Sequence, residues 1–223
     1  MSESATTTTK SLIRRALPSP VVYVIQMFRR LAPASRRVFA RKWLHRLFTR
    51  ASVLPEGIPQ VPRLLFVCHG NILRSAVARA LYTERVSSGR APAGSTAESA
   101  GTAARDGDHA DPRGIEAARE MGIRLDGHRA GRLNQQLIER ADLILVMDYL
   151  NEADVVARFP AAAGKVRLLG SFGGEKGRDA EIRDPYTGSP EDVRASFLMI
   201  ARAVDSLSAI LSLSGTREAG NSA

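Results

Sequence analysis

From residue 63 onward, short apolar segments alternate with segments of helical periodicity, and this alternation restricts the possible fold more than any other feature of the chain. Strands are expected at 63–67, 96–100, 142–148 and 165–169, and helices at 74–88, 112–121, 150–158 and 189–213. Strands that alternate with helices form parallel sheets, because each helix returns the chain to the edge where the previous strand began. The sequence therefore predicts an α/β fold of three layers, in which helices flank a four-stranded parallel sheet.

Basic residues are concentrated at the N-terminal end of the chain. Residues 1–62 contain eleven of the 32 Lys and Arg residues but only two acidic residues, and the rest of the chain is balanced. The net charge of +9 therefore belongs to this segment. Three prolines and a glycine in residues 53–63 prevent a continuous helix there. We expect a basic extension at 1–62, a globular domain at 63–213 and a flexible tail at 214–223.

The basic extension contains two segments with distinct patterns. Residues 10–32 include an apolar run that Pro18 and Pro20 interrupt, too short to span a membrane and without a small-residue cleavage motif. In residues 39–48, a helical wheel separates apolar from basic side chains. A basic amphipathic helix is typical of a membrane-surface or partner-docking element, and an organellar presequence or an unstructured arm are the alternatives.

The chain has one cysteine, Cys68, in the stretch FVCHGNILRSA (66–76). A lone cysteine is either a buried apolar residue or a reactive thiol, and a reducing compartment such as the cytoplasm suits both. The expected strand–loop–helix arrangement places residues 68–73 in a loop that leads into a helix beginning near Arg74. Such a loop directs backbone N–H groups and the positive end of the helix at one point, which stabilises a bound anion and a thiolate.

Other residues of this stretch fit the same chemistry. Gly70 and Asn71 tolerate the positive φ that a tight loop requires. Arg74 presents a planar fork that can bind two oxygens of a phosphoryl group. Cleavage of a phosphoester by a thiolate also needs an acid, and Asp184 lies on a proline-containing loop before the last helix. Loops at the carboxyl ends of parallel strands meet at one edge, which favours the nucleophile over the core cysteine.

Six segments resemble, in the same order, the motifs of the low-molecular-weight protein tyrosine phosphatases. They are VCHGNILRS, SAGT (99–102), DGHRA (126–130), ADLILVMD (141–148), GKVRLLG (164–170) and DPY, within residues 63–212. The sequences of these segments are most similar to those of the bacterial branch linked to tyrosine kinases and exported polysaccharide. The resemblance implies that Cys68 attacks phosphorus, Arg74 binds the phosphoryl oxygens and Asp184 protonates the tyrosine oxygen. Asp184 would then take a proton from the water that hydrolyses the cysteinyl phosphate.

The resemblance also implies supporting residues, partners and a location. The substrate-binding set consists of His69, Gly70, Asn71, Ile72, Leu73, Ser75 and Tyr186. A polar network that braces the loop consists of Asn71, Ser75, Ser99 and His128. The implied partner is a phosphotyrosine protein, such as a tyrosine kinase or a polysaccharide-export component, and not a nucleic acid. No metal or other cofactor is required, and the expected location is the cytoplasm, at the membrane periphery if residues 1–62 bind an anionic surface.

Several positions depart from the family's pattern. Leu73 stands where many members carry a second cysteine, so oxidised Cys68 would have no disulfide partner in the chain. Arg105 and Thr187 stand where apolar or aromatic wall residues are expected, which leaves Tyr186 to stack on a phosphotyrosine ring. Two other functions remain open. An arsenate reductase would need further cysteines, and a catalytically weak phosphoprotein-binding module would fit the altered wall.

Overall fold

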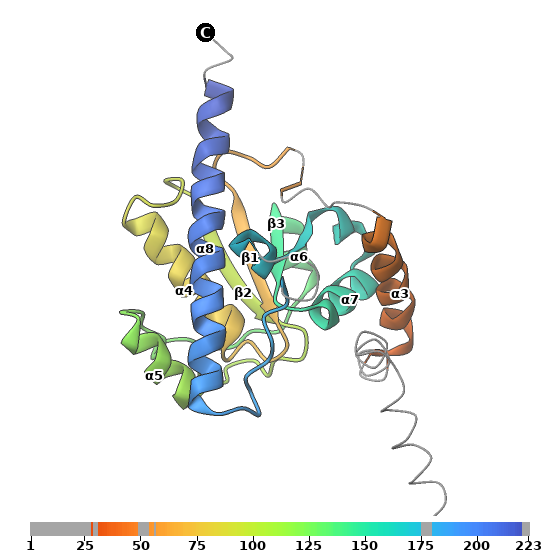
Figure 1. Cartoon of the computed structure of the whole chain (residues 1–223), viewed down its shortest axis with the longest axis horizontal. Helices are drawn as coiled ribbons and strands as arrows, with labels where there is room; N and C mark the ends of the chain where they lie inside the picture. The colour runs from red at the N-terminus through yellow and green to blue at the C-terminus, as the bar shows by residue number, and fades with distance from the viewer. Residues whose placement is uncertain (1–27, 29–30, 49–53, 56, 175–179, 220–223) are drawn as a thin grey trace, which may run out of the picture.

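The computed structural model describes residues 28, 31–48, 54–55, 57–174 and 180–219 (Figure 1). Most of the apolar run at 10–32 therefore lies outside the described residues. The α-helices and strands are α3 (Pro33–Phe48), β1 (Arg63–Cys68), α4 (Arg74–Ser87), β2 (Thr96–Gly101), α5 (Pro112–Glu120), α6 (Gln135–Arg140), β3 (Leu143–Val146), α7 (Tyr149–Arg158), β4 (Val166–Leu168) and α8 (Pro190–Ala219). Two 3₁₀ helices, Pro160–Lys165 and Leu169–Gly173, flank β4.

The four strands form one parallel sheet in the order β2-β1-β3-β4. In the register, Phe66 of β1 lies between Ser99 of β2 and Leu145 of β3. The two central strands are near-continuous apolar runs, RLLFVC and LILV, as expected for strands covered on both faces. The predicted four-stranded parallel sheet is confirmed, and its carboxyl edge carries Cys68.

Alternate residues of β1 belong to two separate cores, one on each face of the sheet. Leu64 and Phe66 pack in the core beneath α4, α5 and α8, whereas Leu65 and Val67 pack in the core beneath α6 and α7. This division follows from the two-residue period of a strand, which directs successive side chains to opposite faces. Helices therefore cover both faces of the sheet (Figure 1), and the predicted three-layer architecture is confirmed.

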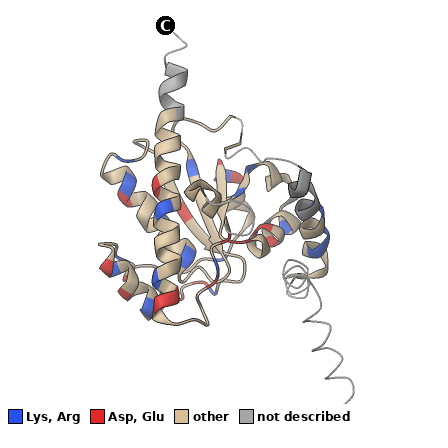
Figure 2. Ribbon diagram, viewed as in Figure 1, with Lys and Arg blue, Asp and Glu red and all other residues tan. Residues whose placement is uncertain are grey.

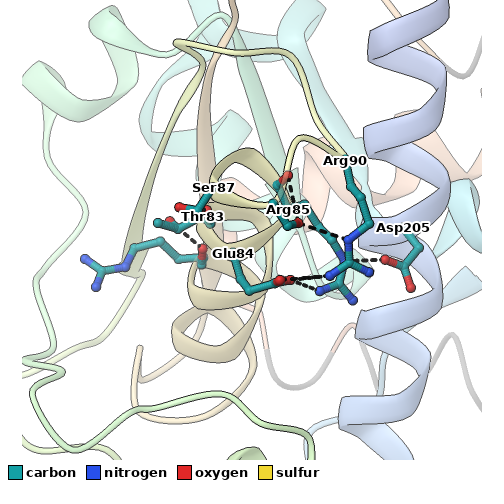
Figure 3. Close-up of polar contacts among 8 residues, drawn as sticks. Thr83, Glu84, Arg85, Ser87, Arg90 and Asp205 are labelled. Carbon is teal, nitrogen blue, oxygen red and sulfur yellow. Dashed lines mark hydrogen bonds and ion pairs between the residues drawn. The ribbon is translucent and has the colours of Figure 1, made fainter.

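Helix α8 is the long core helix on one face of the sheet. It begins with a reciprocal cap, in which the Ser189 N–H donates to Asp192 Oδ2 at 2.8 Å and the Asp192 N–H donates to Ser189 Oγ at 3.3 Å. An ion pair between Arg85 of α4 and Asp205 ties the two helices together (Figure 3). The helix continues to Ala219, so the predicted end at 213 is too early, because an established helix propagates cooperatively.

Residues Pro190–Leu213 of α8 are long and apolar enough to span a membrane, and they are the one such segment within the described parts of the chain. However, Val193, Phe197, Ile200 and Val204 of this segment are fully buried in the core. The core of the sheet domain therefore accounts for the apolar composition of α8.

Part of the basic extension packs against the domain. Helix α3 begins with Pro33 at its first position, six residues before the expected start at 39. Leu31 and Phe39 are each 4% exposed and belong to the core on the α7 side of the sheet. Ser35 Oγ donates to Asp154 Oδ1 of α7 at 2.9 Å. The apolar side of the predicted amphipathic helix is thus at least partly used for packing, although the side chains of 42–48 lie outside the described ones.

Candidate active site

Cys68 lies at the end of β1, and residues 69–73 form the loop that leads into α4, as the sequence predicts. The cysteine is 3% exposed. Its Sγ accepts a hydrogen bond from the Asn71 N–H at 3.2 Å and lies 3.0 Å from Ser75 Oγ. The Asn71 N–H thus donates to the sulfur, and the Ser75 hydroxyl lies within reach of it, an arrangement that can stabilise a thiolate.

Four carbonyl groups of this loop are held outward by neighbouring segments. The Cys68 carbonyl accepts from the Thr102 N–H at 2.9 Å, and the His69 carbonyl accepts from the Ala103 N–H at 2.9 Å. The Asn71 carbonyl accepts from His128 Nε2 at 2.6 Å, and the Ile72 carbonyl accepts from the Asp111 N–H at 3.0 Å. The C=O and N–H groups of a trans peptide point in opposite directions, so the N–H groups that follow these carbonyls face the inside of the loop. The result is a backbone cradle for an anion at the N-terminus of α4.

Asn71 is the centre of the network that braces the loop. It is fully buried and adopts a φ of 54°, in the left-handed region that asparagine tolerates. Its Nδ2 donates to Ser75 Oγ at 2.8 Å, and its Oδ1 accepts the Gly131 N–H at 2.9 Å. The same expectation for Gly70 is wrong, because Gly70 is not among the glycines with positive φ. A Cβ added at Gly70 would meet only the Ile72 side chain, at 3.5 Å or more.

His128 supports the loop from the segment after α5. The ring is 5% exposed, and its Nε2 donates to the Asn71 carbonyl. The pKa of His128 lies below its usual value, mainly because the ring is buried. The nearby positive charges of Arg79 and Arg129 also lower this pKa, whereas the hydrogen bond to Asn71 raises it. We therefore expect a neutral imidazole at pH 7, which fits a structural role.

Ser99, the remaining predicted support residue, lies in β2 beside Phe66 and is half-buried. Instead of Ser99, the neighbouring Ala100 carbonyl faces the loop, 3.4 Å from Ser75 Oγ. No hydrogen bond of the Ser99 side chain is found in the described part of the chain. Of the four predicted support residues, the structure brings Asn71, Ser75 and His128 together but not Ser99.

Arg74 is almost completely buried beside two carboxylates. Its Nη1 donates to Asp148 Oδ2 at 2.7 Å and to the Ile182 carbonyl at 3.0 Å, and its Nη2 lies 2.8 Å from Asp184 Oδ2. Burial alone would lower the pKa of Arg74, but the charges of Asp148, Cys68 and Asp184 raise it above its ordinary value. Within the described residues, no partner is found for the Nε–H. Arg74 lines the cavity beside Cys68, where a planar guanidinium can bind two oxygens of a phosphoryl group.

Asp148 is a site residue that the sequence reasoning missed. Besides its ion pair with Arg74, its Oδ1 accepts the Asn151 N–H at 2.7 Å and caps helix α7. The signal was present at the end of the segment ADLILVMD, but an aspartate before a helix is sufficiently explained as a cap. Only the fold reveals that the same carboxylate reaches Arg74, which lies 74 positions earlier in the chain.

Gly101, in the segment SAGT, is a second position whose role only the fold reveals. A Cβ added there would lie 2.6 Å from the His69 carbonyl oxygen and 2.9 Å from the Asn71 nitrogen. Real Cβ atoms do not approach backbone so closely. A glycine is therefore needed for the end of β2 to lie against the loop.

One cavity of about 250 Å³ brings most of the predicted residues together. Its lining includes Cys68, His69, Gly70, Ile72, Leu73 and Arg74 from the loop, Asp184 and Tyr186 from the segment before α8, and Ala103, Arg105 and Asp108 from the segment after β2. The Asp184 side chain is 44% exposed, and Tyr186 is 57% exposed at the mouth. Asn71 and Ser75 lie behind the loop, and Thr187 is not part of the lining. Among the described residues, no three His, Cys, Asp or Glu side chains are arranged as metal ligands.

Residues 63–216 match the model of a known family, the low molecular weight phosphotyrosine protein phosphatases. The chain belongs to this family. EpsP of Ralstonia nicotianae, a probable low molecular weight protein-tyrosine-phosphatase, is 37% identical over 145 residues, which is 65% of this chain and 92% of that protein. Wzb of Escherichia coli K12 is 35% identical over 139 residues, covering 62% of this chain and 88% of Wzb. The chain is thus a protein-tyrosine phosphatase, a hydrolase of phosphotyrosine, as the resemblance implied.

Solved structures of the phosphatase family confirm the fold. Wzb from E. coli K30 in complex with sulphate superimposes with a TM-score of 0.60 at 30% identity, covering 68% of this chain and 99% of that one. The YwlE arginine phosphatase from Geobacillus stearothermophilus gives a TM-score of 0.63 at 31% identity, covering 70% and 96%. The same architecture therefore occurs in proteins named for two different phosphorylated residues.

Proposed function

We propose that this phosphatase hydrolyses phosphotyrosine with Cys68 as the nucleophile, Arg74 as the phosphoryl-binding residue and Asp184 as the general acid. The observation that carries the proposal is the 2.8 Å contact between Arg74 Nη2 and Asp184 Oδ2 in the cavity that Cys68 also lines. This contact brings a proton donor for the leaving oxygen beside the group that would bind the phosphoryl oxygens. A module that only binds phosphate would not need the acid. The presence of Cys68, Arg74 and Asp184 together therefore favours a catalytic role over a binding role.

In the first step, the Cys68 thiolate attacks phosphorus, and a sulfur–phosphorus bond forms as the bond from phosphorus to the tyrosine oxygen breaks. Ser75 Oγ, which accepts from Asn71 Nδ2, has one hydrogen, which it can donate to the sulfur at 3.0 Å or to the Ala100 carbonyl at 3.4 Å. Asp184, whose Oδ2 lies 2.8 Å from Arg74 Nη2, is beside the phosphoryl group that Arg74 would bind. The Asp184 proton then passes to the tyrosine oxygen.

In the second step, water attacks the cysteinyl phosphate, and the Asp184 carboxylate accepts a proton from this water. The sulfur–phosphorus bond breaks and inorganic phosphate is released. Donation from Ser75 Oγ and from the Asn71 N–H stabilises the thiolate as it leaves. The residues of the chain carry every proton in this cycle, without a cofactor.

The walls of the cavity fit the ring of a phosphotyrosine. Ile72 provides an apolar side, and the exposed ring of Tyr186 lies at the mouth, where it can stack on an aromatic substrate. Arg105 and Asp108 add one charge of each sign to the lining of the cavity. We propose that the natural substrate is a phosphotyrosine protein such as a tyrosine kinase or a polysaccharide-export component, because the motifs are most similar to the bacterial branch linked to these proteins.

We further propose that residues 1–62 form an extension of a catalytic domain at 63–213, and that the enzyme is cytoplasmic and peripheral at an anionic surface. Figure 2 shows basic residues along α3. Arg37 and Arg41 of this helix are exposed, whereas Leu31 and Phe39 are buried in the core. The exposed basic side chains would contribute electrostatic attraction to such a surface. A protein partner with an acidic face is the alternative.

Turnover of a matched set of phosphopeptides tests the proposed function. The purified chain should release phosphate from a phosphotyrosine peptide much faster than from peptides of the same sequence with phosphoserine or phosphoarginine. The phosphoarginine peptide matters because one similar structure is named an arginine phosphatase. A preference for phosphoarginine, or equal turnover of all three peptides, would refute the substrate assignment.

A further inference from the structure

The first turn of α5 lies between the phosphate-binding loop and the loop that carries Asp184. Arg113 of this turn is held by Asp111, whose Oδ1 and Oδ2 accept from Arg113 Nε at 3.0 Å and from Nη2 at 2.8 Å. Asp111 also caps the helix, because its Oδ1 accepts the Arg113 N–H at 2.9 Å. The two-pronged ion pair leaves the guanidinium little freedom to turn.

Arg113 also holds the segment after Asp184, through two backbone carbonyls. Its Nη1 donates to the Gly188 carbonyl at 2.8 Å, and its Nη2 donates to the Tyr186 carbonyl at 2.9 Å. Both acceptors belong to the turn that Asp184 begins, in which the Gly188 N–H donates to the Pro185 carbonyl. Arg113 therefore fixes the path of the chain immediately after the acid.

The chain before Asp184 is fixed independently. The Ile182 N–H donates to the Met147 carbonyl at 2.8 Å, and the Ile182 carbonyl accepts from Arg74 Nη1 at 3.0 Å. Asp184 thus lies between two anchors, one on the sheet edge and one on Arg113. The carboxylate itself is 44% exposed, so its position depends on its contact with Arg74 and on these two backbone anchors.

The same turn of α5 also contacts the phosphate-binding loop. The Asp111 N–H donates to the Ile72 carbonyl at 3.0 Å. Gly114, one residue after Arg113, lies so close to Leu73 that an added Cβ would approach Leu73 Cδ2 to 2.6 Å. One helical turn therefore joins the loop that holds the phosphate to the loop that holds the acid.

We propose that Arg113, oriented by Asp111, is a positioning residue that fixes the Asp184 loop relative to the phosphate-binding loop. This inference rests on the acid role proposed above for Asp184. Arg113 contacts the loop only through backbone carbonyls and does not line the cavity. Its effect on the reaction must therefore pass through the position of Asp184 and of the neighbouring Tyr186.

The test compares two small aryl phosphates that differ in the basicity of the leaving oxygen. Phenyl phosphate needs a general acid, whereas p-nitrophenyl phosphate has a good leaving group and needs it much less. The variant Arg113→Gln should lose about tenfold or more in kcat/KM on phenyl phosphate, because small misplacements of catalytic groups are costly. Its kcat/KM on p-nitrophenyl phosphate and the inhibition constant of inorganic phosphate should change by no more than about twofold. General-acid help is minor for that leaving group, and kcat/KM does not include the second step, in which Asp184 acts as the base.

Two further variants keep the test informative if Arg113→Gln is unstable. Asp111→Asn keeps a good helix cap and the N–H that holds Ile72, but removes the ionic grip on Arg113, so it should give a smaller loss with the same substrate pattern. Arg119→Gln is the matched control on the same helix. Arg119 is 62% exposed and pairs with Glu116 and Asp126, away from both loops, so its removal should leave both substrates unchanged.

The double variant Arg113→Gln/Asp184→Asn separates this inference from the proposed function. If Arg113 acts through Asp184, the double variant should be no slower on phenyl phosphate than Asp184→Asn alone. Equal losses of Arg113→Gln on both substrates, or a further loss in the double variant, would overturn the positioning role. If Asp184→Asn itself lowers kcat/KM equally on both substrates, the acid role fails instead.

Discussion

Arg74 Nη1 lies 2.7 Å from Asp148 Oδ2, and this pair joins the phosphate-binding loop to the start of α7 across the carboxyl edge of the sheet. The contact uses Nη1 of the buried guanidinium, and Arg74 also lines the cavity with Cys68. Asp148 therefore sets the direction in which Arg74 can bind an oxyanion, although Asp148 itself does not line the cavity.

This relationship predicts the effect of Asp148→Asn. Asparagine still caps α7, so the helix should survive, but the guanidinium loses its charged partner. Arg74 would bind the phosphoryl oxygens, which are the same in every aryl phosphate. We therefore expect kcat/KM to fall by about tenfold or more on both phenyl phosphate and p-nitrophenyl phosphate. Asp154→Asn is the control, since Asp154 lies on the same helix but contacts Ser35 of α3. A loss confined to phenyl phosphate would contradict this account.

Asn71→Ala should destabilise the protein by about 2–4 kcal/mol. Alanine is strained at the φ of 54°, and the change leaves the Gly131 N–H without its acceptor. Denaturant unfolding measures the loss. Asn134→Ala is the matched control, because Asn134 only caps α6 and its loss should cost about 1 kcal/mol. Similar losses in the two variants would show that Asn71 is an ordinary loop residue.

Much of the fold follows from local patterns in the sequence. The apolar runs of β1 and β3 identify the central strands, and the serine, proline and acids at 189–192 identify the start of α8. Helix α6 was missed because six residues, QQLIER, are too few to show a helical period. The early start of α3 was missed because it depends on the packing of Leu31 and Phe39 against α7, which no local pattern encodes.

From residue chemistry alone, the site was predictable only where a residue's role is local, and the support role of His128 followed instead from the family resemblance. Cys68, Arg74 and Asp184 stand in short loops whose composition indicates anion binding and acid chemistry. Asp148, Gly101 and Arg113 were missed because their roles depend on neighbours that lie far away in the sequence. The residue type alone also misled at Gly70: glycine permits a positive φ, but of Gly70 and Asn71 only Asn71 adopts a positive φ in the loop.

His128 makes the stability of the protein depend on pH. Burial first, and then Arg79 and Arg129, lower the pKa of His128 in the folded state, so the unfolded chain binds more protons near pH 6. This contribution to stability is present above the unfolded pKa of about 6.5 and is lost as the pH falls through the lower folded pKa. The wild-type protein should therefore lose more Tm between pH 7.5 and about 5.5 than His128→Gln does. His109→Gln, at an exposed position, should follow the wild type.

Binding to anionic vesicles tests the role proposed for the extension. The full-length chain should co-sediment with vesicles that contain phosphatidylserine, less so at high salt, and the chain that begins at residue 63 should not. Removal of Arg37 and Arg41 should weaken binding by about 1 kcal/mol for each residue. Removal of the exposed Arg124 and Arg202 in the catalytic domain is the control and should have little effect. Undiminished binding by the shortened chain would exclude the membrane role.

The covalent intermediate tests the central claim most directly. The enzyme is mixed with phosphotyrosine peptide, quenched in acid within one turnover and analysed by peptide mass spectrometry. We predict one added phosphoryl group on the peptide that contains Cys68, and its absence in Cys68→Ser, which should still bind inorganic phosphate through the intact backbone cradle. A phosphoryl group on any other residue, or measurable turnover by Cys68→Ser, would contradict the mechanism.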